Sequence, residues 1–208
     1  MTTRLHAIVD TDLAVRAGWA PIDLARAFLD GGARLIQLRA KQLSSAAFLD
    51  LADAAVGLAH SYRANVIVND RADIALMSAA AGVHVGQDDL PPSAARRLLG
   101  NGALIGLSTH SVAQVERALR EPISYVAVGP VFGTRSKDTG YEAVGLELVG
   151  GAARQAGELP VVAIGGITLE NAGSVIEAGA TSVAVISDLL VGSDPRGRTQ
   201  AFLQRLTS

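Results

Sequence analysis

The stretch Leu35-Ile36-Gln37-Leu38-Arg39-Ala40-Lys41 begins as a short apolar run and ends in charged residues. The chain repeats this pattern, because seven further apolar runs stop at a glycine or a small polar cluster, at 5–9, 66–68, 83–85, 104–107, 125–128, 161–164 and 183–186. A barrel of alternating strands and helices builds its active site from polar residues at the carboxyl ends of its strands. The pattern therefore predicts an α/β fold, a (β/α)8 TIM barrel.

Helical spacing of apolar residues fills the intervals between these runs. Helices are predicted at 22–29, 45–62, 71–80, 92–99, 112–119, 146–156, 170–178 and 195–206. The alternative is a doubly wound open sheet, which usually shows a glycine-rich turn after its first strand. Asp10-Thr11-Asp12-Leu13 is not such a turn, so the closed barrel is favoured. No linker divides residues 1–208, which are predicted to form one domain.

Composition limits the classes of function. The formal net charge is −2 in 208 residues, so no general basic field is available for nucleic acid or an anionic membrane, and anion binding must be local. Cysteine is absent, which excludes disulfides and thiolate chemistry. Residues 1–4 lack the apolar segment of a signal peptide, and no stretch is long enough to span a bilayer. We expect a cytoplasmic protein, with homo-oligomerisation left open.

Three side chains of the opening stretch share one face. Alternate residues of a strand point the same way, so Gln37, Arg39 and Lys41 project together. Two cations facing the barrel interior are costly unless an anion meets them, which favours a phosphate or diphosphate site. Internal ion pairs with Asp70 or Asp89 are the alternative.

Carboxylates end two neighbouring strands, in Asn69-Asp70 and Asp88-Asp89. Mg²⁺ typically takes one or two carboxylates together with phosphate oxygens and water, so Asp70 and Asp89 are candidate magnesium ligands. Helix capping by these residues is the alternative.

Glycine and serine end the last two strands, in Gly165-Gly166 and at Ser187. Backbone N–H groups at this place in a TIM barrel commonly hold a phosphate, although a tight turn also explains a glycine pair. Residues 129–145 form a long irregular stretch and are a candidate lid over the active site. Within it, residues 134–138 offer hydroxyls and cations to a ligand. The alternative is that 134–138 are a solvated loop.

The four histidines are expected to have different roles. We expect His60 to lie on the surface at a helix end, and His6 and His84 to be satisfied by hydrogen bonds within the barrel. His110, close to Ser108, is the remaining candidate for a general acid or base.

The sequence resembles the thiamine phosphate synthase family in seven motifs that occur in order over nearly the whole chain. They are Gln37-Leu38-Arg39-x-Lys41, Val68-Asn69-Asp70-Arg71, Gly82-Val83-His84-Val85-Gly86-Gln87-x-Asp89, Gly106-x-Ser108-Thr109-His110, Gly129-Pro130-Val131-Phe132-x-Thr134-x-Ser136-Lys137, Ala163-Ile164-Gly165-Gly166-Ile167 and Val185-Ile186-Ser187. The family often has Glu where this chain has Ala40, which points away from the Gln37 and Arg39 face.

The resemblance implies a transferase that joins 4-amino-5-hydroxymethyl-2-methylpyrimidine diphosphate to a thiazole phosphate, releasing pyrophosphate. It implies a Mg²⁺ cofactor on Asp70 and Asp89 and a catalytic set of Arg39, Lys41, Ser108 and Lys137. The implied substrate-binding residues are Gln37, Leu38, Arg39, Ala40, Lys41, Asn69, Ser108 and Lys137 toward the pyrimidine diphosphate, and Thr134, Arg135, Ser136, Gly166, Ile186 and Ser187 in the segments that hold the thiazole phosphate.

The implied reaction needs no nucleophilic side chain. Loss of pyrophosphate leaves a ring-stabilised pyrimidine cation, which the thiazole nitrogen attacks, and fixed cations and Mg²⁺ stabilise the leaving group. Two alternatives are a thiazole tautomerase on the same barrel and a non-catalytic sensor of phosphorylated ligands. The tautomerase needs a base and one phosphate site. It leaves unexplained Lys41, Asn69, Asp70, Asp89 and Lys137.

Overall fold

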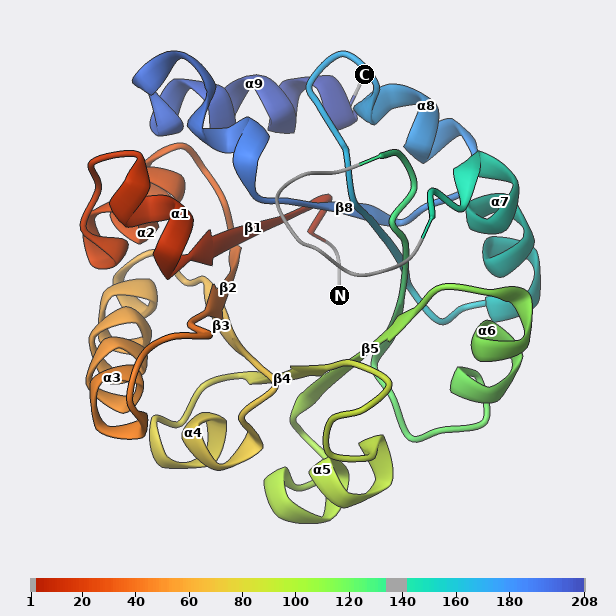
Figure 1. Ribbon diagram of the computed structural model, residues 1–208, viewed down its shortest axis with the longest axis horizontal. Coiled ribbons are helices and arrows are strands. Elements are labelled where there is room, and N and C mark those ends of the chain that lie inside the picture. The colour runs from red at the N-terminus through yellow and green to blue at the C-terminus, as the bar shows by residue number, and fades with distance from the viewer. Residues whose placement is uncertain (1–2, 134–141, 208) are drawn as a thin grey trace.

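Eight parallel strands close into a barrel in the computed structural model, which describes residues 3–133 and 142–207. The strands follow one another around the barrel in chain order, and the last pairs with the first through Leu5 and Val183. Figure 1 shows the helices as an outer ring around these strands. The predicted (β/α)8 TIM barrel is confirmed.

Every predicted apolar run forms a strand. The strands are β1 (Leu5–Asp10), β2 (Leu35–Arg39), β3 (Asn65–Asn69), β4 (Gly82–Val85), β5 (Leu104–Thr109), β6 (Tyr125–Val128), β7 (Val161–Ile164) and β8 (Ser182–Val185). The helices are α1 (Thr11–Arg16), α2 (Pro21–Asp30), α3 (Ser45–Ser61), α4 (Ala72–Met77), α5 (Pro92–Leu99), α6 (Val112–Ala118), α7 (Gly145–Ala156), α8 (Ala172–Glu177) and α9 (Pro195–Thr207), with a 3₁₀ segment, η1 (Ser187–Ser193).

Helix α1 was not predicted. It follows β1 without a loop, and the side chain of Asp10 caps it by accepting a hydrogen bond from the Leu13 N–H at 3.0 Å. An aspartate directly before a helix is a common N-cap residue, so Asp10 is a sequence signal for the start of this helix. The helix has only six residues, too few for a clear apolar periodicity.

The core has two layers because each strand is buried on both faces. The inner cluster fills the barrel with Ile8, Leu35, Ile67, Tyr125, Ala127, Val162 and Ala184. The outer cluster lies between strands and helices, and Phe28, Phe48 and Phe202 are among its fully buried side chains. Burial on both faces explains why the strands read as continuous apolar runs.

The helices cover the barrel and are of modest length. Among the described residues, none combines the length and the apolar character that crossing a membrane requires.

Candidate active site

A cavity of about 490 Å³ lies at the carboxyl ends of the strands. One side of its lining carries polar side chains from β2, β3 and β5, including Gln37, Arg39, Asn69 and Ser108. The other side is made by the segments that follow β7 and β8 and is rich in backbone, as at 165–166. The size of the cavity suits a small organic ligand.

Strand alternation points Gln37 and Arg39 into this cavity. Arg39 forms an ion pair with Asp10 on the adjacent strand β1, whose other carboxylate oxygen caps α1. The Nε of Arg39 is buried and has no hydrogen-bond partner among the described residues. A buried guanidinium donor without an acceptor is costly, so Arg39 is ready to accept an anionic ligand. The partner of Arg39 is thus Asp10, which was not predicted, and neither Asp70 nor Asp89.

Lys41 lies beyond the end of β2 and does not line the cavity in the part of the chain that the structure describes. Its ammonium group forms an ion pair with Asp70, which follows β3. The internal ion pair left open by the sequence is therefore present for Lys41. The Lys41 side chain remains 46% exposed, so its ammonium group can also face a ligand at the rim.

Asp70 and Asp89 lie together at this rim. The Asp89 carboxylate accepts a hydrogen bond from the Gly86 N–H at 2.8 Å. Burial raises the pKa of Asp89, and a hydrogen bond with Asp70 and the charge of Asp70 raise it further. Two carboxylates this close together concentrate negative charge, and a divalent cation would relieve it.

The capping alternative for these aspartates is wrong. Helices α4 and α5 have Arg71 and Pro91 at their N-caps, with no side-chain cap hydrogen bond at either. Asp70 instead has a φ of 65°, in the left-handed region that few residues other than glycine adopt. Within residues 3–133 and 142–207, no three potential ligands of the His, Cys, Asp or Glu type cluster. A metal held by Asp70 and Asp89 would therefore need oxygens from a substrate or water, as Mg²⁺ commonly does.

Ser108 sits at the end of β5 and lines the cavity. Its Oγ lies 2.8 Å from Nε2 of His84, and Nδ1 of His84 lies 2.9 Å from the Tyr125 hydroxyl. The prediction that His84 is satisfied within the barrel is confirmed.

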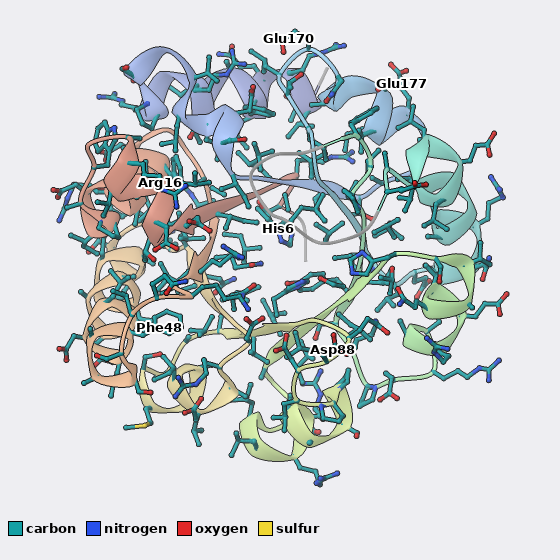
Figure 2. All side chains as sticks on the ribbon, viewed as in Figure 1. His6, Arg16, Phe48, Asp88, Glu170 and Glu177 are labelled. Carbon is teal, nitrogen blue, oxygen red and sulfur yellow. The ribbon has the colours of Figure 1, made fainter. Side chains whose placement is uncertain are left out.

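The same prediction for His6 is wrong. Figure 2 shows His6 in the middle of the barrel, and neither of its ring nitrogens has a hydrogen-bond partner among the described residues. Burial lowers the pKa of His6 to about 3, with a smaller contribution from His84. His6 therefore behaves as a neutral ring, which packs edge-on against Tyr125 at 5.3 Å between centroids.

His110 lines the cavity, and His60 is exposed near the end of α3, as expected. Nδ1 of His110 lies within hydrogen-bond distance of the Gly129 carbonyl oxygen. A carbonyl oxygen accepts only, so Nδ1 carries the proton and this contact fixes the ring orientation. The backbone N–H of His110 donates to the Gln114 side chain at 2.6 Å.

The opposite side of the cavity is shaped by backbone. Gly165 and Gly166 have φ values of 98° and 64°, which favour glycine. A Cβ at Gly166 would lie 2.6 Å from the Gly133 carbonyl oxygen and 2.7 Å from the Phe132 Cβ, so these backbones approach closely. The Asn171 side chain holds the segment by donating to the Gly166 carbonyl at 3.0 Å.

A half-buried side-chain contact connects the two backbone segments. The Asp188 carboxylate, after β8, accepts from the Leu169 N–H at 3.1 Å and from the Arg198 guanidinium at 2.7 Å. Ile186 and Ser187 are thereby held beside 165–166, and both line the cavity. Asp188 and Arg198 were not predicted, because their partners are distant in sequence.

The structure brings most of the predicted site residues together. Those that line the cavity are Gln37, Arg39, Asn69, Ser108, Gly166, Ile186 and Ser187. Leu38 and Ala40 pack in the outer core layer, so only their backbone could reach a ligand. Thr134, Arg135, Ser136 and Lys137, and the middle of the candidate lid at 129–145, lie outside the described residues.

The chain is similar in sequence to known proteins over most of its length. The family model described as thiamine monophosphate synthase matches residues 5–189. The thiamine-phosphate synthase of Roseiflexus castenholzii is 44% identical over 194 residues, covering 93% of this chain and 85% of that protein. That of Thermus thermophilus is 40% identical over 209 residues, covering 99% of this chain and 98% of that protein.

A solved structure extends the similarity to three dimensions. Thiamine phosphate pyrophosphorylase from Pyrococcus furiosus superimposes with a TM-score of 0.88 at 30% identity, covering 98% of this chain and 95% of that one. Orotidine 5'-phosphate decarboxylase from Pyrococcus horikoshii has a TM-score of 0.67 at 16% identity, which shows the barrel fold alone. Sequence and structure thus both relate nearly the whole chain to thiamine phosphate synthases.

Proposed function

The chain belongs to the thiamine monophosphate synthase family and is an enzyme of thiamine biosynthesis, and we propose how its cavity performs the reaction. The substrates are a hydroxymethylpyrimidine diphosphate and a thiazole phosphate, and the products are thiamine phosphate and pyrophosphate. The observation that carries the proposal is the pairing of two unlike anion-binding features in one cavity. Arg39 lies on one side, with further charged side chains after β2, β3 and β4 at the rim, and a backbone cradle after β7 and β8 occupies the other side.

The pyrimidine diphosphate is proposed to bind on the charged side. Arg39 supplies a fixed cation with an unused buried donor, and Lys41 supplies a second cation at the rim. Gln37 and Asn69 add neutral hydrogen-bonding groups between them. We expect Lys137 to join them on the departing pyrophosphate, as the resemblance implies.

Asp70 and Asp89 are the proposed ligands of Mg²⁺. Their fit rests on the closeness of the two carboxylates, since the pKa of Asp89 is raised first by burial and then by a hydrogen bond with Asp70 and by the charge of Asp70. When bound, the ion would neutralise charge on the leaving pyrophosphate. Lys41, already paired with Asp70, would stand beside the same phosphate oxygens.

The thiazole phosphate is proposed to bind in the cradle. The close backbone approach at Gly166 leaves no room for a Cβ, and N–H groups in such turns suit a phosphate. Ile186 and Ser187 complete the cradle, with Thr134, Arg135 and Ser136 as expected contributors from the sequence.

The bond changes then balance without a protein nucleophile. The methylene C–O bond of the pyrimidine substrate breaks, and pyrophosphate leaves with the electron pair. The lone pair of the thiazole nitrogen forms the new C–N bond to the resulting cation. Arg39 and Lys41 act by stabilising the leaving group, and the apolar parts of the cavity exclude water that would otherwise capture the cation.

A turnover assay tests the proposal. Thiamine phosphate and pyrophosphate should form in equal amounts when both substrates and Mg²⁺ are supplied. The tautomerase alternative draws on the position of His110 in the cavity, and it would consume the thiazole phosphate alone. A sensor would give no product from any combination.

A cytoplasmic location is part of the same proposal. Both proposed substrates are phosphorylated, and such charged molecules do not cross a bilayer unaided.

A further inference from the structure

A chain of hydrogen bonds runs from the barrel interior to the cavity. It starts at the Tyr125 hydroxyl on β6, passes through the His84 ring on β4, and ends at Ser108 Oγ on β5. Tyr125 is fully buried, and His84 and Ser108 are each 8% exposed. Of the three, only His84 and Ser108 line the cavity, so Tyr125 acts on a ligand through the other two.

A glycine on β5 makes room for this chain. A Cβ at Gly106 would lie 2.1 Å from Cζ and 2.3 Å from the hydroxyl oxygen of Tyr125. Gly106 pairs in register with Tyr125 on one side and with His84 on the other. The segment Gly106-x-Ser108 therefore admits the phenol at one level and places the serine hydroxyl at the next, because alternate residues share a face.

The direction of the hydrogen bonds follows from the buried phenol. Burial raises the pKa of Tyr125, so its hydroxyl stays protonated and must donate. Among the described residues, the hydrogen-bond partner of this hydroxyl is Nδ1 of His84, which therefore accepts. A neutral imidazole that accepts at Nδ1 carries its proton on Nε2, and this proton goes to Ser108 Oγ. The opposite tautomer would leave the Tyr125 hydrogen without an acceptor in a buried site.

His6 keeps this part of the barrel neutral. It packs edge-on against Tyr125, and its pKa of about 3 leaves it uncharged at neutral pH. Neither of its ring nitrogens has a hydrogen-bond partner among the described residues, so His6 does not compete for the Tyr125 hydrogen.

We propose that Tyr125 and His84 are positioning residues that fix Ser108 as a hydrogen-bond donor to the pyrimidine substrate. With His84 donating to Ser108 Oγ, the serine hydrogen cannot point toward His84 and is directed into the cavity. The site then selects a heteroaromatic ring with an unprotonated acceptor atom facing Ser108, and disfavours a ring with a donor there. The identity of the ligand in this inference rests on the proposed function. The donor-to-acceptor direction of the hydrogen bonds from Tyr125 to Ser108 does not.

The tautomer of His84 can be measured without any substrate. Long-range ¹⁵N–¹H spectra of the ¹⁵N-histidine-labelled protein should show the proton of His84 on Nε2 and none on Nδ1. His84→Gln identifies its signals. A proton on Nδ1, or on both nitrogens at neutral pH, overturns the proposal whatever the enzyme catalyses.

A double-mutant cycle tests the effect on the ligand. Tyr125→Phe should weaken binding of the pyrimidine diphosphate about tenfold, the usual scale of one hydrogen bond, and leave binding of the thiazole phosphate unchanged. In a Ser108→Ala background the same substitution should have no effect, because the group that it orients is gone. Calorimetric titration of each substrate measures all four proteins.

A matched control is Tyr62→Phe, which removes a hydroxyl that bonds Asp30 at 2.7 Å on the outside of the barrel and should leave both affinities unchanged. An equal loss from Tyr125→Phe with and without Ser108 would show structural damage and overturn the proposal. If the pyrimidine diphosphate does not bind the unmodified protein, the proposed function fails. The tautomer measurement still decides which groups donate and which accept between Tyr125, His84 and Ser108.

Discussion

The two sides of the cavity mouth are built from different material. On the β2–β4 side, the groups that face a ligand are charged side chains, including Arg39, Lys41, Asp70 and Asp89. On the β7–β8 side they are mainly backbone, shaped by the close approach at Gly166 and tied down by Asp188. In the proposed function, one side binds its ligand through charge, and the other through backbone N–H groups that no side chain covers. We expect them to respond to opposite kinds of substitution.

Asp89→Asn should give the largest effect, because it removes a proposed magnesium ligand without changing the size of the side chain. We expect kcat to fall by about 100- to 1000-fold, the scale for loss of a charge that acts on the transition state. Steady-state kinetics with both substrates and Mg²⁺ measures this.

The matched control is Asp88→Asn, at the exposed neighbouring position, which should leave kcat within a factor of two, about 0.4 kcal/mol and within the usual range for surface changes. Figure 2 labels Asp88 near α5. Turnover that survives EDTA would show that the metal assignment is wrong.

Gly166→Val tests the backbone side. The new Cβ would lie 2.6 Å from the Gly133 carbonyl, and φ at this position is 64°. We expect affinity for the thiazole phosphate to fall about 100-fold, because charge-assisted hydrogen bonds are lost, while affinity for the pyrimidine diphosphate changes little.

Gly18→Val is the control for backbone strain alone, because Gly18 has a φ of 81° and a Cβ there would meet nothing within 4 Å. Calorimetric titration of each substrate compares the two variants. Equal weakening of both substrates by Gly166→Val, without a drop in melting temperature, would show that the two sides do not bind separate substrates.

Asp10→Asn tests how the charged side is held in place. An asparagine keeps an oxygen for the Leu13 N–H but no longer neutralises Arg39. We expect the free energy of unfolding to fall by about 2 kcal/mol, since a largely buried cation loses its partner. Inorganic pyrophosphate should restore part of the loss by supplying a new anion.

Thermal melts with and without pyrophosphate measure both effects. Asp73→Asn breaks an ion pair with Arg71 that is exposed, and should change stability by no more than about 0.5 kcal/mol. If pyrophosphate does not change the melting temperature of the Asp10→Asn variant, Arg39 does not bind anions.

Acidification should weaken Mg²⁺ binding by the carboxylates on the β2–β4 side. Binding to backbone N–H groups on the β7–β8 side does not depend on these carboxylates. The pKa of Asp89 is raised by burial and by Asp70, and only the ionised form binds a metal. As pH falls through this raised pKa, affinity should drop about tenfold per pH unit, starting above the ordinary aspartate value of about 3.9.

Calorimetric titration of MgCl₂ at a series of pH values measures the onset. In Asp70→Asn the onset should move to lower pH, because one cause of the raised pKa is removed. An onset at the ordinary aspartate value in the unmodified protein would contradict the proposed carboxylate pair.

The sequence was informative where the physics is local. Apolar runs that end in polar residues predicted all eight strands, because strands buried on both faces have few other compositions. Alternation predicted that Gln37 and Arg39 face inward. It was less useful beyond the strand end, where Lys41 leaves the strand geometry and pairs with Asp70.

The roles that the sequence did not predict depend on partner residues that are distant in the chain. The capping roles considered for Asp70 and Asp89 could not be excluded until the helix starts were seen. His6 looked equivalent to His84, yet only His84 meets a hydroxyl on each side. Lys137 and its neighbours lie outside the described residues, so their roles stay predictions.

The sequence by itself determined the barrel and the kinds of residue at its mouth, because strand burial, alternation and the turn chemistry of glycine act over a few neighbouring residues. Only the tertiary structure decided which charges meet and which way hydrogen bonds run. Asp10 and Arg39 come together because β1 and β2 pair in register, and Tyr125 reaches His84 because Gly106 lacks a side chain. Such meetings depend on distances between strands, which no local pattern records.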